Sequence, residues 1–441
     1  MDQPANARSS KPLAGRSAPL PGANWALLLL LSMNMFNYID RYVLAAVEPN
    51  IRQSLLDPDD PNLGKKMGAL PAVFMISYML TAPLFGLLAE RYSRWKLIAL
   101  GVLLWSLASG ASGMAHPISG LATAFTVLLI TRCFVGVGEG AYGPIAPTII
   151  SDFYPVAIRG RVLSWFYMAI PVGGALGYAL GGQVAPAWGW RWAFYVVVPP
   201  GVLLSLWAFL MREPERGASE SLAAPARRAS MKDYSILLQT PSYVWNTLGM
   251  TAMTFAVGAF GYWMPAYLEC QKVEPIWGIQ PVTFFGILTA VAGLTGTMAG
   301  GIIGDWLRRW FSGSYFLVSG AGMVLCVPCA LLFLASSFPA AWYYLFLTEF
   351  FLFFNTGPSN TVLANVTHPS IRATGFALNI LVIHALGDVP SPFLVGAIKD
   401  QWSLTIGYLA VSGFMLLAGV FWLLGARHLE HDTTLAPTRL L

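Results

Sequence analysis

Charged residues are scarce in this sequence. Asp, Glu, Lys and Arg make up 11% of its 441 residues, whereas hydrophobic residues make up 56%. An ordinary soluble protein carries about 25% charged residues. These proportions exclude a water-soluble protein of usual composition, and we expect lipid to be the solvent for most of the chain.

Several chemical motifs are also missing. The four cysteines lie mostly in apolar segments and do not form a disulfide framework, and the Cys326–Cys329 spacing is interpreted as packing because a lipid-embedded segment cannot support thioredoxin-like chemistry. The five histidines form no ligand cluster, and no Gly-Lys-Ser/Thr loop is present. We therefore expect no cofactor, no bound metal, no direct ATP drive and no enzymatic reaction.

Apolar runs long enough to cross a bilayer recur along the whole chain. A helix needs about 20 residues to do so. These runs are continuous and contain Gly and Pro, unlike the alternating segments of a β-barrel. The predicted fold class is an all-α membrane protein with twelve transmembrane helices. The predicted spans are 24–47, 67–89, 95–114, 121–150, 162–184, 192–211, 243–268, 282–303, 315–334, 341–364, 374–398 and 404–424.

The distribution of Lys and Arg predicts the orientation. If the N-terminus is cytoplasmic, 18 of the 26 Lys and Arg residues lie on the cytoplasmic side and six on the other, while Arg41 and Arg132 lie within spans. The positive-inside rule then places both termini in the cytoplasm. The same bias explains the pI of about 9.0, so no nucleic-acid partner is expected.

The chain divides near its midpoint into two similar halves. We predict an N-terminal tail at 1–23, a six-helix bundle at 24–211, a solvated linker at 212–241, a second six-helix bundle at 242–425 and a tail at 426–441. Glu90 and Asp305 lie at matching loops 215 residues apart, and Arg159 and Arg372 are 213 apart. Two matched spacings indicate parallel repeats, which in transporters place the substrate path at their interface.

The two matching loops have the pattern Gly-x-x-x-acid-x-x-x-Arg. They resemble the loop signature of the major facilitator superfamily, although Glu90 stands where the family prefers Asp. The glycine allows close helix approach, and the acid and arginine can pair with each other or with a helix end. We interpret the loops as a conformational latch; the alternative is ordinary solvated charge. The predicted latch residues are Gly86, Glu90, Arg91, Arg94, Asp305 and Arg309.

A closer resemblance lies in the first half. The segments 37–42 (NYIDRY), 138–148 (GEGAYGPIAPT), 166–182 (FYMAIPVGGALGYALGG) and 188–192 (WGWRW) are similar to Spinster-type transporters of that superfamily. The resemblance implies alternating access and an amphipathic lipid substrate, such as a lysophospholipid or a sphingosine-phosphate-like molecule, with proton coupling. Short tails and the lack of a glycosylation sequon on an outward loop suit a bacterial inner-membrane protein, which we expect to be a monomer.

Ionised groups inside the spans are the candidates for coupling, because each costs about 2.5–3.5 kcal/mol near the bilayer centre by insertion scales. The first half holds Asp40, Arg41, Arg132 and Glu139. Arg132 and Glu139 are two helical turns apart and share one face. We expect Asp40 to pair with Arg132 or Arg41 in one state and to lose that partner in another, which links proton uptake to conformation. The alternatives are a static ion pair and, for Glu139, a packing acid bonded to nearby backbone.

The second half is less diagnostic. His384 and Asp388 are one turn apart and form a secondary proton candidate, or a satisfied packing pair; Glu349 is a weaker candidate. Transport of sugars, organic anions or drugs remains the alternative function, and a membrane receptor is the alternative of a different class. The predicted cavity residues are Tyr38, Arg41, Tyr142, Tyr167 and Asn355.

Overall fold

The structure is a computed structural model that describes residues 18–118, 122–215, 231–368 and 371–436. Within these ranges the regular structure is helical, apart from two isolated β-bridges. Large apolar side chains such as Leu80, Leu203 and Met298 are more than 60% exposed on the helix surfaces, as expected for residues that face lipid. The prediction of an all-α membrane fold is confirmed.

The twelve predicted spans correspond to the observed helices. Eight spans are single helices: α1 (Ala23–Ala46), α3 (Leu63–Leu88), α4 (Arg94–Gly113), α7 (Val156–Trp188), α11 (Pro241–Cys270), α12 (Pro281–Leu307), α13 (Ser314–Ala335) and α18 (Leu404–Gly425). Four are interrupted: α5 (Ala124–Gly140) with α6 (Ala146–Phe153), α8 (Trp190–Tyr195) with α9 (Val198–Leu210), α14 (Ala340–Phe353) with α15 (Thr356–Val366), and α16 (Arg372–Ile383) with η2 (His384–Asp388) and α17 (Pro390–Gln401).

The interruptions repeat between the halves. The fourth span breaks between α5 and α6, beside Pro144 and with Pro147 in the first turn of α6. The tenth span breaks at the corresponding place between α14 and α15, just before Pro358. Proline has no backbone N–H to donate, so it favours a helix start over a helix interior. The matching breaks agree with the repeat predicted from the loop spacings.

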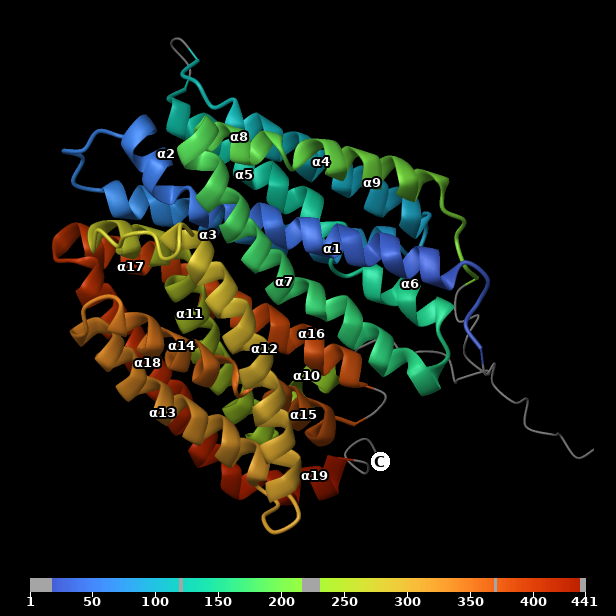
Figure 1. The fold of residues 1–441 in the computed structure, drawn as a ribbon. Helices are drawn as coiled ribbons and strands as arrows, with labels where there is room; N and C mark the ends of the chain where they lie inside the picture. The colour runs from blue at the N-terminus through green and yellow to red at the C-terminus, as the bar shows by residue number, and fades with distance from the viewer. Residues whose placement is uncertain (1–17, 119–121, 216–230, 369–370, 437–441) are drawn as a thin grey trace, which may run out of the picture.

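The helices form two bundles (Figure 1). The blue-to-green bundle contains α1 to α9, and the yellow-to-red bundle contains α11 to α18. Inside the first bundle, glycines on α7 allow close packing against α1. A Cβ atom at Gly177 would lie 2.7 Å from the Ile39 carbonyl oxygen, and one at Gly173 would lie 2.6 Å from that of Met35. These glycines therefore join two helices of one bundle.

Parts of the predicted linker and tail are packed rather than wholly solvated. The linker ends in α10 (Met231–Leu238), whose Leu237 is buried. The tail contains α19 (Leu429–Leu435), and its Asp432 carboxylate accepts a hydrogen bond of 2.8 Å from the backbone N–H of Ser242 at the start of α11. Linker residues 216–230 and the chain ends 1–17 and 437–441 lie outside the described residues. Pro369 and Ser370, just before Arg372, also lie outside them.

The bundles meet at one end, which we call the α2 end because α2 (Glu48–Leu55) lies there. The opposite end, at which α1 begins and Arg91 and Arg308 lie, we call the basic end. At the α2 end, α3 packs against α17 and α7 against α12. Asp400 accepts hydrogen bonds from the backbone N–H groups of Gly64 (2.5 Å) and Lys65 (2.9 Å), and so caps the start of α3 from the other bundle. The α2 end is therefore closed.

Candidate functional site

A cavity of about 200 Å³ lies between the bundles, beside the last third of α1 and the π-helical turn η2. Side chains of both bundles form its walls. The polar and aromatic residues that matter for its chemistry are Tyr38, Arg41, Phe74 and Arg132 from the first bundle and His384 and Asp388 from the second.

Asp40 and Arg132 form a buried ion pair behind the cavity wall. Arg132 Nη2 lies 3.1 Å from Asp40 Oδ2, and both side chains are at most 2% exposed. Ser109 on α4 donates its hydroxyl to the other oxygen, Asp40 Oδ1. Among the described residues, the Nε and Nη1 atoms of Arg132 have no hydrogen-bond partner. Arg132 also lines the cavity, although these two nitrogens are themselves buried.

Arg41 and Glu139 form a second ion pair close to the first. Arg41 Nη2 lies 2.6 Å and Nε 2.7 Å from Glu139 Oε2, while the Glu139 side chain is fully buried. The Arg41 guanidinium also stacks on Tyr38, Phe74 and Tyr78, at 5.0, 4.9 and 5.5 Å from the ring centroids. Adjacent residues 40 and 41 thus bind opposite charges on the same helix, α5. Sequence reasoning had not paired Arg41 with Glu139.

The second bundle contributes a histidine and a carboxylate. His384 Nδ1 lies 2.9 Å from Asp388 Oδ2, so the predicted contact within one helical turn is present. Both residues belong to η2, a π-helical turn, and a Cβ atom at Gly258 of α11 would lie 2.7 Å from the Asp388 Cβ atom. Turns of this kind often occur at functional sites. The close approach at Gly258 holds the pair against the cavity.

Three other predicted cavity residues do not line this cavity, and their role stays a prediction. Tyr142 is buried inside the first bundle and donates its hydroxyl to the Leu30 carbonyl. Asn355 is fully buried in the second bundle, where its side-chain amide donates to the Leu352 carbonyl. Tyr167 is 49% exposed on α7 and packs edge-on against Phe166. Tyrosine and asparagine were chosen by type, and type alone does not fix which face of a helix they occupy.

Glu349 lies closer to the bundle interface than the sequence indicated. Its side chain on α14 is 3% exposed. Tyr42 and Tyr178 of the first bundle are within electrostatic range of its carboxylate. The structure therefore places it near the junction between the bundles, but not on the cavity wall.

Residues 30–392 match the family model of the Major Facilitator Superfamily. The chain is also 35% identical to Protein spinster homolog 3 of Danio rerio, over 92% of this chain and 85% of the relative. The chain belongs to the spinster family of the Major Facilitator Superfamily. It is a multi-pass membrane transporter, as the loop signature and the first-half segments had indicated.

Other comparisons agree with this assignment. The human Protein spinster homolog 1 is 36% identical over 86% of this spinster-family chain and 74% of its own length. Among solved structures, a bacterial homologue of the human lysosomal transporter Spinster, in an inward-facing and unoccupied conformation, has a TM-score of 0.79 at 21% identity over 93% of this chain and 98% of that one. A D-xylose-proton symporter has a TM-score of 0.70 at 18% identity over 90% and 97%. At these identities the solved structures establish the fold.

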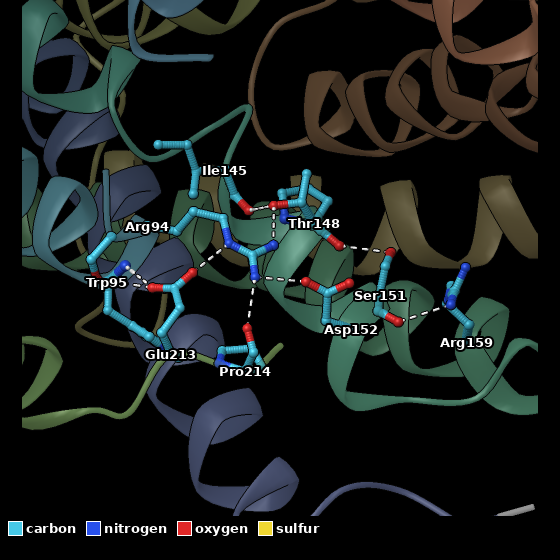
Figure 2. Close-up of polar contacts among 11 residues, drawn as sticks. Arg94, Trp95, Ile145, Thr148, Ser151, Asp152, Arg159, Glu213 and Pro214 are labelled. Carbon is cyan, nitrogen blue, oxygen red and sulfur yellow. Dashed lines mark hydrogen bonds and ion pairs between the residues drawn. The ribbon is translucent and has the colours of Figure 1, made fainter. Parts of the chain in front are cut away.

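The first predicted latch loop of the spinster-family chain leads into a charge network at the basic end (Figure 2). Arg94 lies 2.6 Å from Glu213 Oε1 and 2.6 Å from Asp152 Oδ2, and it also donates to Thr148. Glu213 in turn accepts hydrogen bonds from the Ser93 hydroxyl and the Trp95 backbone N–H. The network ties the start of α4 to α6 and to the stretch after α9. Thr148 and Asp152 belong to the first bundle, and Glu213 belongs to the start of the predicted linker, so these contacts do not reach the second bundle.

The remaining latch residues are more exposed. Arg91 and Arg309 are exposed on the surface of the basic end. Asp305 accepts a hydrogen bond of 2.8 Å from Tyr315, and the Arg308 guanidinium lies over the Tyr315 ring, 5.2 Å from its centroid. Arg308 therefore contacts this group, and the latch role of Arg309 stays a prediction.

Gly86 of the first loop does not make the close helix contact that the sequence predicts. A Cβ atom at Gly86 would meet no atom within 4 Å, so the predicted close approach at this glycine is not made in this conformation. Glu90 has a partner within the protein. Arg159, which matches Arg372 in the second half, donates to the Ser151 carbonyl (Figure 2) and to the Tyr154 carbonyl. It therefore caps the end of α6.

Sequence reasoning missed several members of these networks. Ser109 gave no signal, because a lone serine in an apolar helix is common. Asp152 and Glu213 lie near the ends of predicted spans. They were missed because the positive-inside rule concerns Lys and Arg and says little about carboxylates. Buried Arg94 required partners, so a search for nearby acids is the signal that would have found them.

Proposed function

We propose that this spinster-family protein is a proton-coupled secondary transporter that moves amphipathic lipids by alternating access. The proposed substrates are lysophospholipids or sphingosine-phosphate-like molecules. The proposed location is a cell inner membrane, with the basic end and both termini in the cytoplasm and the protein acting as a monomer. The observation that carries the proposal is the pair of adjacent ion pairs, Asp40–Arg132 and Arg41–Glu139, at the wall of a cavity between two bundles.

Coupling follows from the chemistry of these pairs. A proton bound to Asp40 or Glu139 removes a negative charge and frees the partner arginine. A freed arginine near the cavity then attracts an anionic group, so proton binding and substrate binding influence each other. His384 and Asp388 face the same cavity from the second bundle and form the secondary candidate for this role.

The charge arrangement supports a polar head group as the bound part of the substrate. Arg41 and Arg132 both line the first-bundle wall, and two nitrogens of Arg132 have no hydrogen-bond partner among the described residues, so this wall suits a phosphate. Asp388 lies on the opposite wall and suits a cationic group. A cavity of about 200 Å³ is smaller than the roughly 300–1,000 Å³ of a typical ligand pocket. We infer that it holds the head group, while the acyl chain lies outside it.

Transport of sugars, organic anions or drugs is the second candidate. The cavity size also suits a small polar solute, and a D-xylose-proton symporter shares the fold. One fold supports many functions, so the residues of the binding site, and not the fold, determine the substrate. A membrane receptor, the remaining class, would bind such a ligand without accumulating it.

Transport by the purified protein in liposomes tests the proposal. The panel comprises a lysophosphatidylethanolamine, a sphingosine phosphate, xylose and a dicarboxylate, each with and without an imposed pH gradient. We expect gradient-dependent movement of the two lipids only. Gradient-driven xylose or dicarboxylate transport would transfer the assignment to the second candidate, and saturable binding without movement of any solute would indicate a receptor.

A further inference from the structure

The acid Glu48 lies at the α2 end, one short stretch of chain beyond Asp40 and Arg41 of α1. It is the first residue of α2, directly after α1, and its side chain is fully buried. Within the part of the chain that the structure describes, neither of its carboxylate oxygens has a hydrogen-bond partner. Its nearest counter-charge is Arg52, whose Nε lies 3.3 Å from Glu48 Oε1.

Arg52 is shared between the two bundles. Its Nη2 lies 2.5 Å from Oε2 of Glu269 at the end of α11, and Gln53 donates to the other oxygen of Glu269. Glu48 and Glu269 therefore compete for one arginine. One of these contacts lies within α2, and the other joins the first bundle to the second.

The groups around Glu48 come mainly from the second bundle. Those within electrostatic range are Arg52 on α2, Glu269, Cys270 and Tyr262 on α11, and Lys399 on α17. Tyr262 also donates its hydroxyl to the Met67 carbonyl of α3, across the junction. Separation of the bundles at this end would remove α11 and α17 from Glu48 and let water reach it.

We propose that Glu48 is a second proton-binding site, whose occupancy favours the closed α2 end through Arg52 and Glu269. When Glu48 is protonated it no longer attracts Arg52, which is then left to Glu269 on the opposite bundle. When Glu48 is ionised it draws Arg52 back into α2 and carries a buried negative charge. This inference rests on the alternating-access part of the proposed function and is independent of the substrate.

The direction of the pH effect follows from burial. Loss of water around the buried carboxyl raises the pKa of Glu48 from 4.5 to about 7, against a smaller lowering by Arg52 and Lys399. Opening the α2 end would return the pKa toward 4.5. The closed form then binds the proton more tightly, so acidification from pH 8 to 5 favours closure. The difference sets an upper limit of about 300-fold on the change in the closed-to-open ratio.

Electron paramagnetic resonance distances across the α2 end provide the test. Spin labels are placed at P58C in the first bundle and W402C in the second, in the full chain in nanodiscs with the four native cysteines replaced. We expect the closed-to-open ratio to rise at least tenfold from pH 8 to 5. E48Q mimics the protonated acid and should be closed at both pH values, with less than a twofold change. D59N, which neutralises an exposed acid in the same region, should respond as the parent does.

Two further variants separate this site from the central one. E269Q removes the acceptor on the second bundle and should lower the closed fraction at every pH. The double variant D40N/E139Q should keep the pH response of the α2 end. The proposal is overturned if E48Q retains the full response, or if the double variant abolishes it. Failure of gradient-driven transport in liposomes would refute the proposed coupling but would leave this distance measurement unaffected.

Discussion

Asp40 on α1 and Arg132 on α5 form an ion pair of 3.1 Å, although each side chain is at most 2% exposed. Burying such a pair costs several kcal/mol per ion before their attraction is counted, so it contributes little to stability by itself. The pair lies beside the cavity and beside the Arg41–Glu139 pair, which favours a role in function rather than in stability. The two pairs cross between the same helices, so a change in one alters the field at the other.

Asp40→Asn should uncouple transport from the pH gradient. Asparagine keeps the shape of the side chain, but its amide is neutral and neither binds nor releases a proton. Water in the cavity can hydrate the lone Arg132, so we expect the protein to fold. Gradient-driven uptake in liposomes should fall at least tenfold, to the rate without a gradient. Ser109→Ala is the control, because it removes the hydrogen bond to Asp40 and leaves the charge. Full gradient-driven uptake by Asp40→Asn would refute the role.

Arg41 and Glu139 should act as one unit. Glu139→Gln and Arg41→Gln each break the same pair, so the double variant should be no slower than the slower single variant, within about twofold. Initial rates of gradient-driven transport measure this. The control cycle combines Glu139→Gln with Asp388→Asn, and Asp388 is not in contact with Glu139 in the described structure. In this cycle the losses of transport rate should be closer to multiplicative, that is, additive in free energy. Multiplicative losses in the Arg41–Glu139 cycle would contradict the idea of one coupled pair.

The sequence was sufficient for the fold because lipid imposes simple demands on it. Apolar length predicted the twelve spans, and loop spacing predicted the repeat, since both depend on residue type and position alone. The interruption at Pro144 is a local property of proline, yet span 121–150 was predicted as continuous. Composition cannot tell a broken helix from a whole one when both are equally apolar.

The site was predictable in its members but not in its pairing. Asp40, Arg41, Arg132 and Glu139 were identifiable because charge is rare in a bilayer. Which acid pairs with which arginine depends on the rotation of α1 against α5, and no residue type encodes that rotation. Glu48 was overlooked for a related reason. It lies just beyond a predicted span, where an acid is normally solvated, and only the packing of α11 and α17 buries it.

Arg94 should be the main stabilising residue of the basic-end network. Arg94→Ala leaves Asp152 and Glu213 without their shared counter-charge, which we expect to cost about 3 kcal/mol. Glu213→Gln keeps a hydrogen-bond acceptor and should cost about 1 kcal/mol. The exposed Arg91→Ala is the control and should change stability by less than about 0.5 kcal/mol. Unfolding of the purified variants in detergent measures these changes in the free energy of unfolding. Equal losses of stability for Arg94→Ala and Arg91→Ala would contradict the prediction.

Gly86 tests whether the predicted latch forms in another conformation. A Cβ atom there meets nothing within 4 Å, so Gly86→Ala should leave this conformation intact and stabilise its helix by about 0.5–1 kcal/mol. The glycine matters only if α3 approaches a neighbour closely when the α2 end opens. We therefore expect liposome transport to fall at least fivefold in Gly86→Ala, and further in Gly86→Leu, while thermal stability does not decrease. Gly413→Ala on α18 also has open space around its Cβ atom and should transport normally. Normal transport by Gly86→Leu would show that no close contact forms at this loop in any state of the cycle.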